Sequence, residues 1–92
     1  MKHDKEKDVE RHLVEKCPEG AWCIKLNPIG LRGLPDRMLL LPGGRIYFIE
    51  LKISSGRLSR LQEYVHSRLR ALGFMVYVLW SREQVDAFLC QL

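Results

Sequence analysis

The most constraining feature of the sequence is a pair of apolar runs separated by the tripeptide Pro42-Gly43-Gly44. The first run covers residues 36–41, and the second covers residues 45–53. The second run is rich in β-branched and aromatic residues, which favour strands. Three residues that include glycine are a common hairpin connection, because glycine tolerates positive φ. The sequence therefore predicts a β-hairpin.

A three-residue loop fixes which residues of the hairpin face one another. Leu41 then lies opposite Arg45, and counting back along both strands places Asp36 opposite Glu50. Because side chains alternate along a strand, Asp36, Glu50 and Lys52 share one face. Two facing carboxylates, with Cβ atoms roughly 4.5–5.5 Å apart, repel each other unless a cation lies between them. Oxygen ligands at that spacing suit Mg²⁺ or Mn²⁺, so the pattern predicts a metal site with Lys52 within reach of a phosphate.

Each of these three residues has an ordinary alternative explanation. Asp36 could be a turn residue, Glu50 an exposed strand residue and Lys52 a salt-bridge partner. Their coincidence on one face, at one end of one hairpin, favours a functional site over three independent accidents.

Pro35-Asp36 and Glu50-Leu51-Lys52 also resemble the PD-(D/E)xK nuclease motif. Further residues narrow the resemblance to the VRR-NUC domain (virus-type replication-repair nuclease), namely Gly33, the Gly43-Gly44 turn, Gly56, Ser59, Gln62 and Gly73. The resemblance extends from Glu10 to Trp80. It implies a metal-dependent endodeoxyribonuclease of the stand-alone phage or bacterial type, acting on Holliday junctions or other branched DNA in replication, recombination or repair.

The resemblance also implies roles for individual residues. Asp36 and Glu50 would hold Mg²⁺ or Mn²⁺, with the backbone carbonyl of Leu51 as a further ligand. Lys52 would orient the attacking water and stabilise the pentavalent state, and Gln62 would position water or phosphate.

The predicted helix around Gln62 leaves two points open. Ser59-Arg60-Leu61-Gln62 matches a capping box, which is an alternative role for the glutamine. Many nucleases of the superfamily place a tyrosine four residues after this glutamine, where this chain has His66. His66 could take the place of that tyrosine in contacting phosphate, but we expect His66 to be an exposed helical residue.

Residues 4 to about 17 predict a helix with an apolar stripe that includes Val9 and Leu13. The resemblance implies that a glutamate of this helix joins the metal site. Glu10 adjoins Val9, so we expect Glu10 to be that residue, with Glu6 as the competing candidate one turn earlier. The alternative for Glu10 is a solvated surface acid.

The rest of the chain completes an α/β pattern. It predicts a half-buried strand at 21–26 with Trp22, Ile24 and Leu26 on one side, a turn at 27–30, a helix to about residue 72 with Leu58, Leu61, Val65, Leu69 and Leu72 buried, an interior strand at 74–80, and a final helix after a second capping box at 81–84. The order α-β-β-β-α-β-α predicts a mixed sheet flanked by helices, the restriction-endonuclease-like core, in a single domain of residues 1–92.

The charge balance favours a polyanionic partner. The chain has 15 basic and 11 acidic residues, a net charge of +4, and the DNA partner follows from the resemblance. Candidate DNA-binding residues near the acidic pair and the start of the second helix are Arg32, Arg37, Arg57, Ser59 and Arg60. Ninety-two residues leave little room for a broad DNA surface, so we expect a homodimer. Apolar residues available for its interface are Trp22, Tyr47, Phe74 and Trp80.

Composition also excludes some classes. No apolar run approaches the ~20 residues of a membrane span, and the charged N-terminus does not resemble a signal peptide. Three cysteines without metal-site spacing indicate reduced thiols, so we expect a cytoplasmic protein of a bacterial or phage-infected cell. A catalytically inactive DNA-binding module of the same fold is the alternative function, but retention of the acid pair and Lys52 argues against it. An assembly protein would leave the facing carboxylates unexplained.

Overall fold

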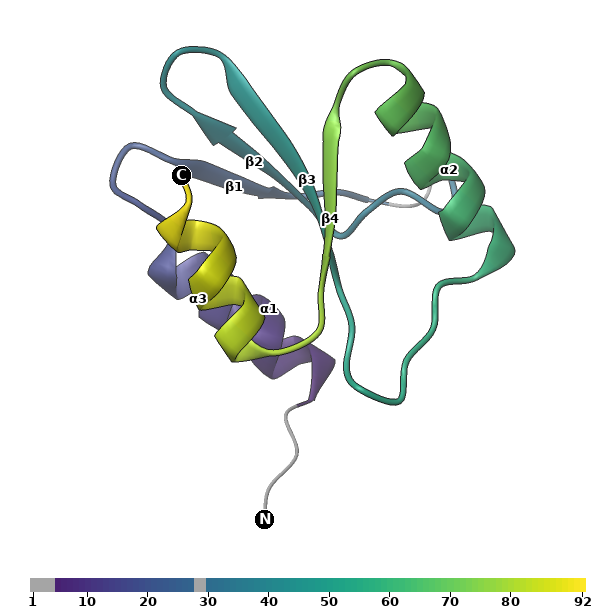
Figure 1. The fold of residues 1–92 in the computed structure, drawn as a ribbon, viewed down its shortest axis with the longest axis horizontal. Helices are drawn as coiled ribbons and strands as arrows, with labels where there is room; N and C mark the ends of the chain where they lie inside the picture. The colour runs from purple at the N-terminus through teal and green to yellow at the C-terminus, as the bar shows by residue number, and fades with distance from the viewer. Residues whose placement is uncertain (1–4, 28–29) are drawn as a thin grey trace.

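The computed structural model describes residues 5–27 and 30–92. Its elements are α1 (Glu6–Lys16), β1 (Trp22–Lys25), β2 (Arg37–Leu41), β3 (Arg45–Leu51), α2 (Arg60–Ala71), β4 (Met75–Leu79) and α3 (Arg82–Cys90) (Figure 1). The predicted order α-β-β-β-α-β-α is confirmed. Residue 4, at the predicted helix start, and residues 28 and 29 of the predicted turn lie outside the described part.

The four strands form one mixed sheet in the order β1-β2-β3-β4. β1 and β3 are antiparallel to β2, whereas β4 is parallel to β3. The predicted hairpin register is confirmed, since Leu41 pairs with Arg45 and Met38 with Phe48. Gly43 and Gly44 have φ values of 85° and 76°, which residues with a Cβ rarely adopt. The connection therefore needs glycine at these positions.

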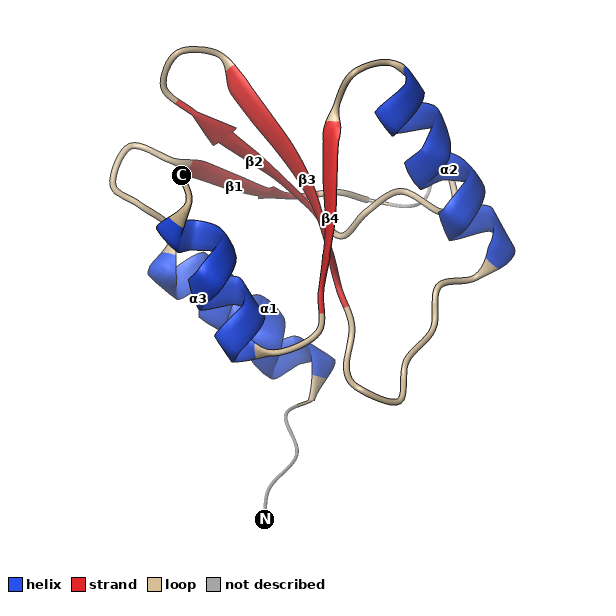
Figure 2. Cartoon of the chain, in the orientation of Figure 1, coloured by secondary structure: helices blue, strands red, loops and turns tan. Residues whose placement is uncertain are grey.

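Helices cover both faces of the sheet (Figure 2). α1 and α3 lie side by side on one face, and α2 lies on the other. The core under α1 and α3 contains Val9, Leu13, Leu39, Leu41, Ile49, Leu51, Leu79, Val85 and Phe88. Because side chains alternate along β3, Phe48 and Glu50 point away from this core, toward α2. The strand thus carries a carboxylate on the face opposite to the main core.

The buried stripe of α2 contains fewer residues than the leucine spacing predicts. Its buried residues are Val65 and His66, whereas Leu61 is 45% exposed and Leu72 is 69% exposed. The five-residue apolar stripe is therefore wrong at these two leucines. α2 contacts the sheet mainly through β4, a single strand, which is too narrow to cover the whole apolar side of the helix. Gly73, with φ of 95°, ends the helix as expected.

The two edge strands, β1 and β4, show how the helices cover the sheet. Trp22 is 66% exposed, and it is Cys23 that packs against the core, because that core lies on the Cys23 side of the sheet while α2, on the other side, contacts β4. β4 is an edge strand of the sheet, so the prediction of an interior strand at 74–80 is wrong. Its apolar character reflects the helices α2 and α3 on its two faces, not a strand on each side.

The N-terminal cap of α3 and the three cysteines complete the description of the fold. The second capping box is half formed, since Ser81 accepts from the Gln84 N–H but the Gln84 side chain bonds to the Trp80 N–H at 2.8 Å. Cys17 and Cys23 pack against the core as free thiols, and Cys90 is exposed. Within residues 5–27 and 30–92, no helix has the length and apolarity needed to cross a membrane.

Candidate active site

Asp36 lies at the entrance to β2, directly after the buried Pro35. Its side-chain Oδ2 accepts a hydrogen bond of 2.8 Å from the backbone N–H of Leu51, and its backbone carbonyl accepts one of 2.9 Å from Leu26. Gly33, three residues earlier, has φ of 89°, and a Cβ there would lie 2.9 Å from the carbonyl oxygen of Leu61. Close packing of this loop against α2 thus fixes the carboxylate beside the end of β3.

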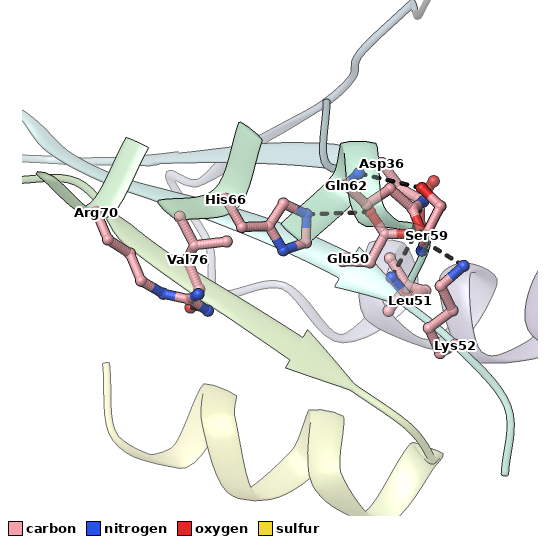
Figure 3. A network of polar contacts seen from close by, with 9 residues as sticks. All are labelled: Asp36, Glu50, Leu51, Lys52, Ser59, Gln62, His66, Arg70 and Val76. Carbon is pink, nitrogen blue, oxygen red and sulfur yellow. Dashed lines mark hydrogen bonds and ion pairs between the residues drawn. The ribbon is translucent and has the colours of Figure 1, made fainter. Parts of the chain in front are cut away.

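Glu50 is the buried centre of the site, with 1% of its surface exposed. Gln62 Nε2 donates to its Oε2 at 3.2 Å, and Lys52 Nζ lies 3.7 Å from the same oxygen (Figure 3). The other oxygen, Oε1, is buried without a hydrogen-bond partner. Burial, and then the negative charge of Asp36, raise the pKa of Glu50 to about 8, against a lowering by the charge of Lys52. The protein therefore places a carboxylate where its charge is poorly compensated.

Lys52 occupies the face of β3 predicted from strand alternation. Its backbone N–H donates to the Leu79 carbonyl at 3.0 Å, which ties it to β4. Its side chain is 14% exposed, so most of the stem is buried while the ammonium lies near Glu50. A Cβ at Gly56 would lie 3.3 Å from Lys52 Cδ and 3.2 Å from the Ile53 carbonyl oxygen. The turn after β3 therefore packs closely against the lysine.

Gln62 forms the predicted capping box, and its side chain also reaches Glu50. Its Oε1 accepts from the Ser59 N–H at 2.9 Å, while Ser59 Oγ accepts from the Gln62 N–H at 3.1 Å, which completes a capping box. At the same time its Nε2 donates to Glu50. The cap of α2 is therefore what aims the amide at the carboxylate.

The third carboxylate near Asp36 and Glu50 comes from Glu6, not Glu10. One carboxylate oxygen from each of Glu6, Asp36 and Glu50 lies within 4.8 Å of the other two. Glu10 instead pairs with Arg37, Nε to Oε2 at 2.7 Å, and lies 3.5 Å from Lys25 Nζ.

The expectation for Glu10 is therefore wrong in this structure, and the reason is topological. α1 packs on the sheet face opposite to Glu50, so a residue one turn into the helix meets the side chains of that face, such as Arg37. Only the first turn, where Glu6 lies, brings a carboxylate to the end of the sheet.

The residues present suit a hard divalent cation. Mg²⁺ and Mn²⁺ prefer oxygen ligands, and three carboxylates converge here. One oxygen of the most buried carboxylate has no hydrogen-bond partner in the protein. Burial and the negative charge of Asp36 raise the pKa of Glu50, and a cation would offset that negative charge.

Two known proteins are similar to this chain over most of its length. No family model matches the chain. A protein of Acyrthosiphon pisum secondary endosymbiont phage 1, named "Putative nuclease p44", is 38% identical over 84 residues, which cover 90% of each chain. A solved structure described as a VRR_NUC domain superposes with a TM-score of 0.83 and 33% identity, over 90% of this chain and 91% of that one. The chain belongs to the VRR-NUC family of nucleases.

The candidate DNA-binding residues of this VRR-NUC chain differ in whether their side chains are exposed or engaged within the protein. Arg37 is bound to Glu10 and to the Cys23 carbonyl, so the expectation that it contacts DNA conflicts with its position. Arg32, Arg57 and Arg60 are exposed. The hydroxyl of Ser59, the fifth candidate, is engaged in the α2 cap.

His66 lies beside Glu50, where the sequence predicted an exposed helical residue. It is fully buried rather than exposed, and its Nε2 lies 3.6 Å from Glu50 Oε1 (Figure 3). Burial, and then the charge of Arg70, lower the pKa of His66. A signal was available in the sequence: residues four apart on a helix share one side, so a glutamine pointing into the site brings His66 with it.

Proposed function

We propose that the chain is a metal-dependent endodeoxyribonuclease that hydrolyses DNA phosphodiester bonds. The observation that supports this best is the burial of Glu50, 1% exposed, beside Asp36 and Glu6. Such an arrangement costs stability unless it serves a ligand, and the ligand it suits is a divalent cation. Membership of a nuclease family supports the same chemistry.

The cation would be held by the carboxylates of Glu6, Asp36 and Glu50. The backbone carbonyl of Leu51 is proposed as a further ligand. The N–H of the same residue already donates a hydrogen bond to Asp36. When bound, Mg²⁺ or Mn²⁺ would supply Lewis-acid chemistry, lowering the pKa of a water and neutralising charge on the scissile phosphate.

Lys52 and Gln62 would act on the reacting groups from the protein side. The Lys52 ammonium, held by its buried stem and by the turn at Gly56, can donate to a phosphate oxygen and orient the attacking water. Charge on that oxygen grows in the transition state, so a fixed ammonium stabilises it more than it stabilises the bound substrate. Gln62 keeps Glu50 in place and presents its amide to water or phosphate. Attack on phosphorus and release of the 3′ oxygen leave a 5′-phosphate and a 3′-hydroxyl.

The surface that would follow the DNA backbone contains Arg32, Arg57 and Arg60, all exposed. These arginines flank Gly33 and the start of α2, where the helix dipole favours a phosphate. The excess of basic over acidic residues, a net +4, supports a polyanionic substrate.

We further propose that the enzyme works as a homodimer on branched DNA. The exposed apolar residues Trp22, Leu72 and Met75 support a second copy as partner. So does an apolar groove of about 360 Å³ beside α2, lined in part by Leu31 and Leu72. Tyr47, by contrast, packs at a tilt against Tyr77 and edge-to-face against Phe88, so its ring is used within the fold. Light scattering at micromolar concentration should give twice the chain mass, and a monomeric mass with uncoupled nicking would contradict the dimer.

The proposal is tested by incubating the protein with labelled four-way junctions, forks, flaps and linear duplexes, each with Mn²⁺ or with EDTA. The expected result is cleavage only with the metal, strongest on a branched substrate, with 5′-phosphate ends. Cleavage of the linear duplex at an equal rate would remove the structure selectivity but leave the nuclease. No cleavage of any substrate under any condition would remove the nuclease itself.

A further inference from the structure

Two buried polar groups in the described residues face each other without either being satisfied. Glu50 Oε1 and both ring nitrogens of His66 have no hydrogen-bond partner. Both side chains are 1% exposed, so bulk solvent does not reach them. Glu50 Oε1 and His66 Nε2 lie 3.6 Å apart, just beyond the range of an N–H···O hydrogen bond. A small shift of either side chain would satisfy one atom on each.

The surroundings of Glu50 divide its two oxygens between different partners. Oε2 accepts from Gln62 Nε2 and lies near Lys52 Nζ. Oε1 has His66 as its neighbour, and Gln62 and His66 project from successive turns of α2. Figure 3 shows the imidazole edge directed at the carboxylate, with Arg70 and Val76 on the far side of the ring. One helix thus addresses both oxygens of the buried carboxylate.

We propose that His66 is a positioning residue for Glu50. Its Nε2–H donates to Oε1 when the carboxylate is charged and bound to metal, and so fixes the rotation of the carboxylate. This inference rests on the proposed metal-dependent function. It adds a role for a residue that does not touch the metal, the phosphate or the attacking water.

The alternative is that His66 merely fills space beneath α2. A buried imidazole with unpaired nitrogens is a poor filler, because an apolar side chain of similar size avoids the cost of desolvating them. The two explanations predict opposite results when the imidazole is replaced. If His66 positions Glu50, removing its N–H donor lowers the metal affinity of the protein. If His66 only fills space, the affinity does not change.

The test measures Mn²⁺ affinity of the protein without DNA, by calorimetry or electron paramagnetic resonance. His66→Leu should weaken binding by about tenfold or more, as is typical for loss of an outer hydrogen bond to a metal ligand. His66→Gln, whose amide nitrogen can reach the place of Nε2, should retain most of the affinity. His66→Asn, whose shorter amide reaches only the place of Nδ1, should not. Val65→Ala is the matched control, because it loosens the buried side of α2 at the neighbouring residue without removing a polar group.

A second measurement on the unaltered chain avoids any loss of folding in the variants. Nitrogen-15 NMR of the histidine rings in saturating Mg²⁺ should show His66 with its proton on Nε2. A proton on Nδ1 alone would direct a lone pair at the carboxylate and would overturn the inference.

The outcomes separate this inference from the function on which it rests. If the wild type binds Mn²⁺ and His66→Leu binds it equally well, the positioning role is wrong and the metal site stands. If the wild type does not bind Mn²⁺ at all, both fail.

Discussion

The backbone N–H of Leu51 donates a 2.8 Å hydrogen bond to Oδ2 of Asp36. The ladder between β2 and β3 ends at the pair of Arg37 and Ile49, which lies one residue after Asp36 and two residues before Leu51. A side chain therefore continues the hairpin where the backbone pairing stops. The same carboxylate that closes the hairpin stands beside Glu50, so Asp36 combines a structural role with the proposed role in the metal site.

The two roles of Asp36 can be separated by substitution. Asp36→Asn keeps an oxygen acceptor for Leu51 and removes the repulsion with Glu50, so the metal-free variant should be as stable as the wild type or more so. Asp36→Ala also removes the acceptor and should be about 1 kcal/mol less stable than Asp36→Asn. Urea unfolding in EDTA measures the difference, and equal midpoints for the two variants would show that the Leu51 bond contributes nothing.

Glu6 and Glu10 should behave differently when each is changed to Ala. Glu6→Ala should weaken Mn²⁺ binding with little effect on folding, because Glu6 is exposed and joins the carboxylate cluster. Glu10→Ala leaves the half-buried Arg37 without its carboxylate and should cost about 1–2 kcal/mol of stability. Its Mn²⁺ affinity should change little. Calorimetry together with urea unfolding decides the assignment, and a larger loss of affinity for Glu10→Ala would reverse it.

Lys52→Ala should reduce turnover much more than DNA binding. Affinity for DNA is summed over many phosphate contacts, so one ammonium adds little to it. At the reacting phosphate the same ammonium acts on charge that develops in the transition state. Single-turnover cleavage and filter binding on one substrate should show a rate at least about a hundredfold lower and a dissociation constant nearly unchanged. Weak binding with a normal single-turnover rate would make Lys52 a backbone contact only.

The metal-free protein should lose stability as the pH rises from 6.5 to 8. Over this range the unfolded chain has an ionised Glu50, whereas in the folded chain, where the pKa is about 8, the carboxyl keeps its proton. The folded state therefore binds more protons, and the free energy of unfolding should fall by up to about 2 kcal/mol.

Below pH 6.5 the lowered pKa of His66 acts in the opposite sense, because the unfolded histidine gains a proton that the folded one does not. The groups that face Glu50 are Glu6, Asp36, Lys52 and His66. Glu50→Gln should remove the slope between pH 6.5 and 8, measured by urea unfolding in EDTA. An unchanged slope in that variant would assign it to another group.

Sequence alone predicted the hairpin and its register because both follow from local rules. A three-residue loop with two glycines fixes the pairing, and alternation then places Asp36, Glu50 and Lys52 together. Helix caps are similarly local, which is why the Ser59 and Gln62 box is correct. These features need no knowledge of how helices pack on the sheet.

Sequence alone did not predict which face of the sheet each helix covers. Glu10 adjoins the core-facing stripe of α1, but that stripe packs on the side of the sheet away from Glu50. Trp22 alternates with Cys23 as expected, yet the covered side of β1 is the one with Cys23. His66 is buried because α2 lies over Glu50, and the pattern of leucines in α2 does not reveal this. Such information depends on contacts between elements distant in the chain.

The central claim is that Asp36 and Glu50 hold a divalent cation on which DNA cleavage depends. The most direct test is cleavage of a labelled four-way junction by the wild type and by Asp36→Asn, each at matched concentration with Mn²⁺ and with EDTA. Circular dichroism confirms beforehand that the variant is folded. We predict cleavage by the wild type with Mn²⁺, and no cleavage in the other three combinations of protein and additive. Cleavage by the wild type in EDTA, or by Asp36→Asn with Mn²⁺ at the wild-type rate, would contradict the account.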